Sequence, residues 1–467
     1  MTTKTYMSQA TFAVVNPATG DVVAHVPDAG PELGREAIDR AVEAFGSWKR
    51  RTAFERGEIL RRWRDAMLRE EEALARLMTR EMGKPIVEAR GEVRYAAGFV
   101  DWFAEEGKRA YGDVLPTHAS NKRLLALRQP VGPVYAVTPW NFPAAMVTRK
   151  VAPALAAGCT IVLKPAEQSP LTAVRLAELW IESGGPGDAF QVLTTSQPAA
   201  LSEVFFDDAR VRKLTFTGST EVGMRLYAQA ARTMKRVSLE LGGHAPFLVF
   251  DDADMPAAVL QVMASKFRNA GQTCVCANRI YVHERIHEPM VEQLSVAVRA
   301  VRVGDPLEDS TQVGPLVDAA GLAKVEAHVA DAVGKGARVV VGGHSRGGLY
   351  YDPTVLTGVA PGMRILEEET FGPVAPVLSF ASEAEAVRLA NATPFGLAAY
   401  VWTRDLGRAF RMAEALDYGI VGVNDGLPST PHAPFGGMKL SGIGREGGRW
   451  GLDEYLDVKY VSIGLPE

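Results

Sequence analysis

Short apolar segments alternate with segments of helical periodicity along residues 134–232. The predicted strands cover residues 134–137, 160–163 and 213–216, and the predicted helices cover residues 144–157, 171–183 and 220–232. Parallel strands are joined by long crossovers, and helices on both faces bury them, so their sequences are almost entirely apolar. The alternation therefore predicts a doubly wound parallel sheet.

A second alternating series begins near Asp251. Its predicted strands are residues 280–282, 338–341 and 399–402, and its predicted helices are residues 288–301, 319–333 and 406–416. The chain has 467 residues, and a domain has roughly 100–200. We therefore expect two α/β domains. Amphipathic helices fill residues 32–111, whereas residues 120–129 and 455–463 are predicted to be extended chain outside either sheet.

Composition excludes several classes of protein. The formal net charge is −4 and no long Lys/Arg tract occurs, which disfavours a nucleic-acid partner. The most apolar stretch, residues 151–163, ends at Lys164 and is shorter than the ~18–20 residues of a membrane span. Three cysteines and no apolar segment near the N-terminus predict a cytoplasmic protein without a disulfide framework.

Cys274 lies in a loop that suits a nucleophile. Gly271 lets backbone approach a ligand closely, and Gln272 and Thr273 surround the sulfur with dipoles. Glu240, which opens a Glu-Leu-Gly-Gly string, supplies a carboxylate that can act as a base. A lone cysteine is more often a buried structural residue, but these flanking residues favour covalent attack on a carbonyl.

Two further segments follow predicted strands, where open α/β sheets bind ligands. Asn141 lies between Pro139 and Pro143, and its amide suits an oxyanion hole; the alternative is a turn with a capping Asn. Lys164 and Glu167 follow the next strand and suit the hydroxyls of a ribose; the alternative is a surface ion pair.

Two more segments carry weaker signals. Gly218 and Ser219 open a predicted helix, whose first N–H groups can hold a pyrophosphate. The pattern is not G-x-G-x-x-G, and taken alone it indicates a simple N-cap. Glu369 and Phe371 suit a ribose or nicotinamide contact, although a solvated acidic cluster is the default interpretation. We expect all four segments at the carboxyl ends of strands.

Taken together, these segments resemble the NAD(P)-dependent aldehyde dehydrogenase superfamily, and the likeness extends over essentially the whole chain. The matching blocks keep the family order and are residues 138–143, 164–167, 216–223, 240–243, 267–274, 369–373 and 434–437. The resemblance implies that Cys274 is the nucleophile, that Glu240 is the general base, and that Asn141 and the Cys274 backbone N–H form the oxyanion hole. The implied cofactor contacts are Trp140, Lys164, Glu167, Gly218, Ser219, Glu369 and Phe371.

Glu167 bears on the choice of cofactor. A carboxylate beside the adenosine ribose would repel a 2′-phosphate. We therefore predict NAD as the preferred cofactor, with NADP as the alternative.

Within the superfamily the chain most resembles the succinate-semialdehyde dehydrogenases. Arg149, Arg268 and Ser441 match that family's carboxylate-binding trio, and two guanidinium groups with a hydroxyl can hold the anionic end of a short aldehyde. Glutarate semialdehyde, 2-oxoglutarate semialdehyde, sulfolactaldehyde and a phosphonate-bearing aldehyde satisfy the same two arginines. Less favoured alternatives are a CoA-acylating dehydrogenase and a cysteine hydrolase.

Several residues depart from the family pattern or add to it. His244 replaces a more usual Asn, and Asp425 and His432 lie in an atypical stretch that we expect at the substrate mouth. Cys276 follows two residues after Cys274, as in relatives that form a disulfide there under oxidation. A low-pKa thiolate at Cys274 would favour that exchange; the alternative is that Cys276 is a second small core residue. No metal site is expected, because Cys-x-Cys has no His or third Cys at ligand spacing.

The resemblance also implies a domain organisation. Residues 1–112 and 131–240 would form a Rossmann-like NAD(P)-binding domain, and residues 241–447 a catalytic domain. Residues 113–130 and 448–467 would form a small β extension for oligomerisation. The family's dimers extend a sheet with a strand from another subunit, so a homodimer or homotetramer is expected.

Overall fold

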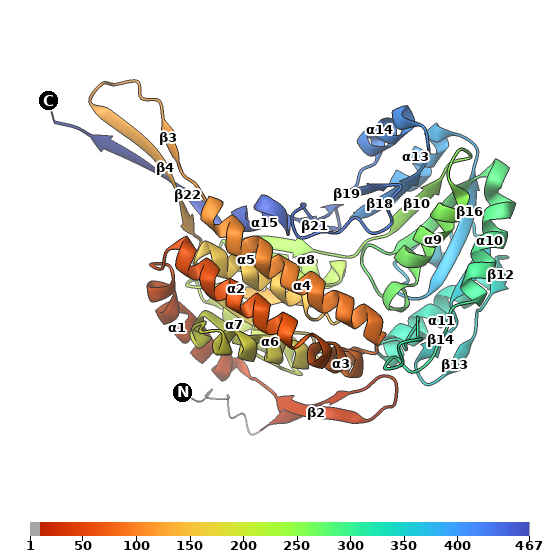
Figure 1. Ribbon diagram of the computed structural model, residues 1–467, viewed down its shortest axis with the longest axis horizontal. Coiled ribbons are helices and arrows are strands. Elements are labelled where there is room, and N and C mark those ends of the chain that lie inside the picture. Colours follow the sequence, from red (N-terminus) through yellow and green to blue (C-terminus); the bar gives the residue numbers. More distant parts are fainter. Residues whose placement is uncertain (1–9, 467) are drawn as a thin grey trace.

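The computed structural model describes residues 10–466. Two lobes lie side by side, each built around one sheet, and a narrow arm projects from the first lobe (Figure 1). The α/β class predicted from the alternation of strands and helices is therefore confirmed.

The first lobe contains a six-stranded sheet. In spatial order its strands are β21 (Gly442–Ile443), β9 (Arg236–Glu240), β8 (Lys213–Thr217), β5 (Val134–Val137), β6 (Ile161–Lys164) and β7 (Phe190–Val192). All pairs are parallel except β21 with β9. Successive residues of β5 point to opposite faces, so Val134 and Ala136 enter one core and Tyr135 enters the other.

Helices cover both faces of this sheet. One face carries α2 (Ala53–Arg69), α3 (Glu71–Met82), α4 (Ile86–Glu106), α5 (Ala145–Ala157) and α6 (Leu171–Glu182). The other face carries α1 (Pro31–Trp48), α7 (Pro198–Asp207) and α8 (Thr220–Ala231). The sheet is thus doubly wound, and its core is closed on both sides.

The second lobe contains a seven-stranded sheet. Its strands in spatial order are β12 (Arg338–Val341), β15 (Thr354–Thr357), β16 (Val374–Phe380), β11 (Ala277–His283), β10 (Ala245–Val249), β18 (Ala398–Trp402) and β19 (Ile420–Val423). Only β12 and β15 pair antiparallel. Helices α9 (Met255–Lys266), α10 (His287–Arg299) and α11 (Ala319–Gly334) pack on one face, and α13 (Glu383–Asn391) and α14 (Leu406–Ala415) on the other.

The remaining elements are short. They are the hairpin β1 (Thr11–Val15) and β2 (Val22–Pro27), the pairs β13 (Ser345–Gly347) with β14 (Tyr350–Tyr351) and β17 (Phe395–Gly396) with β20 (Met438–Lys439), the helices α12 (Arg364–Glu367) and α15 (Gly448–Asp453), and the 3₁₀ turns η1 (Gly107–Arg109), η2 (Gly187–Ala189), η3 (Arg268–Gly271) and η4 (Glu284–Ile286).

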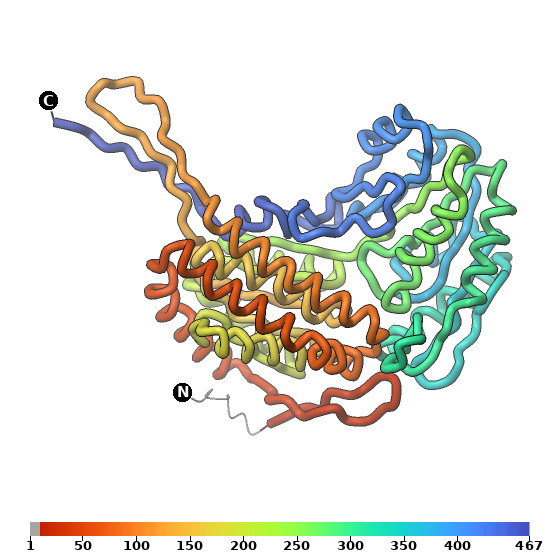
Figure 2. The backbone as a smooth tube through the Cα atoms, in the orientation of Figure 1, coloured from red at the N-terminus to blue at the C-terminus, as the bar shows by residue number. Residues whose placement is uncertain are grey.

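The arm joins two segments that are far apart in the sequence. It consists of β3 (Asp113–Leu115), β4 (Lys122–Pro130) and β22 (Leu456–Gly464). The last strand runs antiparallel to β4 along its whole length, from the pair Leu456 and Pro130 to the pair Gly464 and Lys122 (Figure 2). Both segments predicted as extended chain outside the sheets are found here.

The chain crosses between the lobes twice near the same place. Residues 241–244 connect β9 of the first sheet to β10 of the second, and β21 later returns to pair with β9. The sequence prediction placed residues 442–443 in the second domain, whereas their strand pairing attaches them to the first sheet. The domain boundaries themselves stay a prediction.

Candidate active site

Cys274 follows a tight, left-handed segment of backbone. Helix α9 ends at Lys266, and η3 then holds Asn269 at φ 52° and Ala270 at φ 55°, followed by Gly271 at φ 74°. This region is costly for residues other than glycine, and such strain persists only where the surroundings fix it. A Cβ at Gly271 would lie 2.2 Å from the Gly372 carbonyl oxygen, so this position requires glycine.

Side chains from other elements hold the loop in place. Glu88 of α4 accepts a hydrogen bond from the Asn269 N–H at 2.8 Å. Gln272 donates to the Asn269 carbonyl at 3.0 Å and accepts from the Val317 N–H at 3.0 Å. These bonds fix the backbone directly before the half-buried Cys274.

Asn141 lies beside this loop, as the sequence predicted. It is 3% exposed, and its Nδ2 donates to the Gln272 carbonyl at 3.1 Å. The Asn141 carbonyl accepts from Lys84 Nζ at 2.7 Å and from Asn269 Nδ2 at 3.1 Å. The Asn141 amide is therefore held against Gln272, which precedes the candidate nucleophile Cys274 by two residues.

Glu240 ends β9 and is buried, 3% exposed. Neither carboxylate oxygen has a hydrogen-bond partner within residues 10–466. Burial, with Glu446 as a second cause, raises the pKa of Glu240 well above its usual range. A carboxyl with a raised pKa and unused oxygens is what a general base in a dry site needs.

Glu446 was not predicted from the sequence. It receives Lys150 Nζ at 2.5 Å and lies 2.8 Å from Arg149 Nε. These two cations hold the pKa of Glu446 below its usual value although burial acts in the opposite direction. Glu240 and Glu446 are thus buried acids in different surroundings: Glu446 is paired with two cations, and Glu240 has no hydrogen-bond partner within residues 10–466.

A cavity of about 350 Å³ opens at Cys274. Its lining residues are Glu88, Gly91, Glu92, Tyr95, Phe142, Met146, Arg149, Arg268, Thr273, Cys274, Val275, Leu427, Ser429 and Phe435. Four of them follow helical spacing along one face of α4, which forms one wall. The volume is at the small end of ligand pockets, so it suits a short molecule.

Both predicted substrate arginines line this cavity. The Arg149 guanidinium lies 3.8 Å from the centre of the Phe435 ring, and its Nη2 has no hydrogen-bond partner among the described residues. Arg268 lies 5.2 Å from the centre of the Phe142 ring and forms no ion pair with any residue of the described range. Both cations therefore have capacity to bind an anion.

The predicted cofactor residues lie around the carboxyl ends of β5, β6 and β8. Lys164 Nζ donates to Glu167 at 2.5 Å, and Ser219 caps α8 by accepting from the Val222 N–H at 3.4 Å. A Cβ at Gly218 would lie 2.4 Å from the Phe216 ring, so this position requires glycine. A helix that begins at the exposed Ser219, and a Lys–Glu pair at the carboxyl end of another strand of the same sheet, fit a dinucleotide.

Glu369 and Phe371 belong to the second lobe and directly precede its strand β16. The prediction that this segment follows the carboxyl end of a strand is wrong, because it follows α12 instead. Glu369 accepts from the Gly243 N–H at 3.3 Å, and the rings of Phe371 and Trp140 meet edge to face at 5.5 Å. The two lobes therefore each contribute one side of the predicted cofactor site.

A family model of the aldehyde dehydrogenase family matches residues 5–461 of this chain.

The chain belongs to the aldehyde dehydrogenase family.

Relatives of high identity support this assignment. The chain is 54% identical over 454 residues to the succinate-semialdehyde dehydrogenase [NADP(+)] GabD of Escherichia coli, covering 97% of this chain and 94% of that protein. It is 52% identical to the glutarate-semialdehyde dehydrogenase of Pseudomonas aeruginosa, with coverages of 97% and 94%. It superposes on the crystal structure of succinate-semialdehyde dehydrogenase from Burkholderia pseudomallei with a TM-score of 0.96 at 52% identity, covering 98% and 95% of the two chains.

Ser441 does not line the cavity at Cys274 in this aldehyde dehydrogenase. It is fully buried, donates to the Gly242 carbonyl at 2.7 Å and accepts from the Gly396 N–H at 2.9 Å. Its hydroxyl therefore bonds to backbone groups at the crossing between the lobes. Ser429 lines the cavity instead. The sequence signal for Ser429 was the atypical stretch 424–433, which was expected at the substrate mouth. Leu427 and Ser429 of this stretch line the cavity, whereas Asp425 and His432 are exposed and do not line it.

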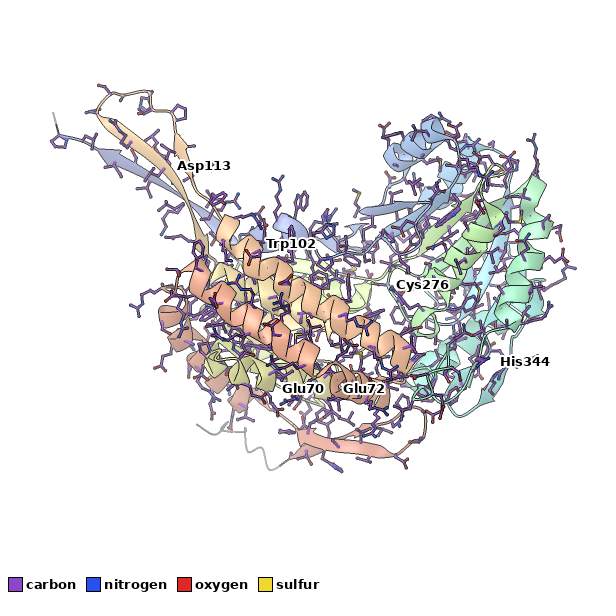
Figure 3. All side chains as sticks on the ribbon, in the orientation of Figure 1. Glu70, Glu72, Trp102, Asp113, Cys276 and His344 are labelled. Atoms are coloured by element: carbon purple, nitrogen blue, oxygen red, sulfur yellow. The ribbon has the colours of Figure 1, made fainter. Side chains whose placement is uncertain are left out.

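The thiol chemistry of this aldehyde dehydrogenase also differs from the prediction. Burial raises the pKa of Cys274 to about 12, with Arg149 partly opposing the shift. The predicted low-pKa thiolate is therefore wrong, because desolvation of the sulfur outweighs the attraction of Arg149. Cys276, labelled in Figure 3 near the junction of the lobes, is fully buried and donates to the Lys266 carbonyl. A Cys274–Cys276 redox switch stays a prediction.

His244 lies in the core next to this site. It is fully buried, and burial lowers its pKa well below the usual value. Its ring meets Phe395 at 6.4 Å, and its carbonyl accepts from Arg279 at 2.8 Å. We therefore interpret His244 as a neutral core residue that packs against Phe395.

Proposed function

We propose that this aldehyde dehydrogenase oxidises a short aldehyde with an anionic end, and that succinate semialdehyde is its main substrate. The observation that carries the proposal is a single small cavity that contains Cys274 and two guanidinium groups. A four-carbon chain can place its aldehyde at the sulfur while its carboxylate binds the arginines. Relatives named for succinate and glutarate semialdehydes support this class. Glutarate semialdehyde is the principal alternative, followed by 2-oxoglutarate semialdehyde, sulfolactaldehyde and a phosphonate aldehyde.

Members of this family use NAD or NADP, and the site fits that group. Lys164 and Glu167 would hold the adenosine ribose, and Gly218 and Ser219 would face the pyrophosphate at the start of α8. Glu369, Phe371 and Trp140 would enclose the nicotinamide side. The bound cofactor supplies a hydride acceptor.

Each residue of the site has a defined task in the proposed cycle. The Cys274 sulfur attacks the aldehyde carbon, and Asn141 Nδ2 with the Cys274 N–H stabilises the oxyanion. Loss of hydride from the thiohemiacetal leaves a thioester on Cys274. Glu240 then removes a proton from water, which attacks the thioester and releases the acid. The raised pKa of the resting thiol means that Cys274 must lose its proton before or during attack.

Arg268→Ala should lower kcat/KM for succinate semialdehyde by roughly 10- to 100-fold, the range of charged hydrogen bonds. The value for uncharged butanal should change less than about threefold. Arg268 is the better probe, because Arg149→Ala would remove an ion-pair partner of the buried Glu446. Breaking such a pair would destabilise the folded protein by about 3–5 kcal/mol. The exposed Arg94→Ala serves as the control. Equal losses for both aldehydes would refute the anion clamp.

We further propose that NAD is preferred over NADP, because Glu167 is half-buried beside Lys164. Glu167→Ser should increase the NADP/NAD ratio of kcat/KM by about tenfold or more, since it removes a repelling charge and frees Lys164 for a phosphate. Gln168→Ser is the matched control. A wild-type enzyme with higher kcat/KM for NADP, the cofactor in the name of the E. coli relative, would contradict the proposal.

We propose that the arm makes this protein a homodimer or homotetramer. Val114, Val458 and Tyr460 on the arm are 80%, 69% and 60% exposed. Large apolar side chains on exposed strands are unusual unless another subunit covers them.

No helix within residues 10–466 is both long and apolar enough to cross a membrane. The cytoplasmic location stays a prediction.

A further inference from the structure

Glu88 and Glu92 are the two acidic residues lining the substrate cavity that the proposed cycle does not use, and Glu88 is the one without a cationic partner in the described chain. It lies on the cavity face of α4 with Gly91, Glu92 and Tyr95, at the spacing i, i+3, i+4 and i+7. Glu92 is neutralised, because it contacts Lys84 Nζ and accepts from the Ala144 N–H at 2.9 Å. Glu88 forms no ion pair with any residue of the described chain, and its one hydrogen bond there is from the Asn269 N–H at 2.8 Å.

Charged groups surround Glu88 on several elements. Lys84 precedes α4, Glu92 and Tyr95 lie on α4, Arg268 lies on η3, Arg149 on α5, and Cys274 follows η3. Burial raises the pKa of Glu88 to about 7, while Lys84 and Arg268 act against this shift. The charge of Glu88 therefore changes within the physiological range of pH.

We propose that Glu88 is a specificity-determining residue, whose carboxylate offsets the positive charge of Arg268 and weakens binding of an anionic substrate until Glu88 takes up a proton. This inference rests on the proposed function, because it concerns the same anionic end of the substrate. Glu88 thereby sets how strongly the cavity distinguishes an anion from a neutral aldehyde.

The direction of the effect follows from linkage. A bound anion near Arg268 disfavours the charged form of Glu88, so anion binding is accompanied by uptake of up to one proton from solvent, depending on pH. Anion preference must then decrease as pH increases through about 7. A substrate carboxylate stays ionised throughout this range, because its own pKa is near 4–5. The other titrating groups, Cys274, Glu240 and Glu369, act on both classes of aldehyde.

The test is the ratio of kcat/KM for succinate semialdehyde to that for butanal, measured from about pH 6 to about pH 9. In wild type this ratio should decrease by about tenfold, the size of a like-charge interaction across a small polar cavity. In Glu88→Gln it should be flat and stay at its high value. The amide oxygen still accepts from Asn269, so the variant should keep the wild-type Tm. Glu36→Gln, an exposed carboxylate on α1, should behave as wild type.

A second measurement detects the proton directly. Calorimetric titration with butyrate, the same anion without the aldehyde, in two buffers of different ionisation enthalpy gives the protons taken up on binding. Wild type should take up a fraction of a proton at pH 7, and Glu88→Gln none. A Glu88→Gln variant that keeps the pH slope or the proton uptake would overturn the role of Glu88 while leaving the anionic substrate intact. A wild type that never prefers succinate semialdehyde over butanal would overturn the proposed function and this inference together.

Discussion

Cys274→Ala should reduce dehydrogenase kcat/KM by roughly 10⁵-fold or more, as in enzymes that lose a nucleophile acting as part of a unit. No other cysteine lines the cavity, and neither Cys159 nor Cys276 is accessible, since both are fully buried. The variant should still bind NADH, because the predicted cofactor contacts are on other segments. Initial rates of NADH formation and quenching of protein fluorescence by NADH would measure the two properties.

Cys276→Ser provides the matched control for this change. It alters a sulfur two residues away that is buried against the Lys266 carbonyl, and a hydroxyl can donate to the same oxygen. We expect its activity to stay within about threefold of wild type. If Cys274→Ala keeps more than a trace of activity, the covalent route is wrong.

Glu240→Gln should decrease steady-state kcat by roughly 10²–10⁴-fold, the range for loss of a positioned base. Hydride transfer precedes the step that needs Glu240, so a rapid burst of about one NADH per active site should remain. In wild type, kcat should increase with pH, because burial raises the pKa of Glu240 and so moves its deprotonation to higher pH, and only the deprotonated carboxylate acts as the base. The variant should lose this dependence. Stopped-flow absorbance and pH profiles would measure both.

Hydroxylamine offers a sharp control for the Glu240 variant. It attacks thioesters without a general base, so it should restore turnover in Glu240→Gln if the thioester accumulates. Glu36→Gln should leave burst and steady state unchanged, because this side chain is exposed on α1. Absence of a burst would instead assign Glu240 to a step before hydride transfer.

The sequence by itself determined the fold class and the central chemistry. Continuous apolar strands such as residues 134–137 can be buried only between two layers of helices, and Val134 and Tyr135 indeed enter different cores. The loop around Cys274 and the turn at Asn141 carry local patterns that indicate their chemistry, and the structure brings them together. Such features are encoded by neighbours along the chain, so they can be interpreted without coordinates.

The tertiary structure alone decided which side chains share the cavity and in what charge state. Ser441 and Ser429 lie close together in the sequence, but Ser441, directly before strand β21, bonds to backbone at the crossing between the lobes, while Ser429 lines the cavity. The raised pKa of Cys274, the pairing of Glu446 with Lys150 and the position of Glu88 beside Arg268 depend on burial and on contacts between residues far apart in the chain. Desolvation and long-range charge are properties of the packed molecule, and no local pattern of residues records them.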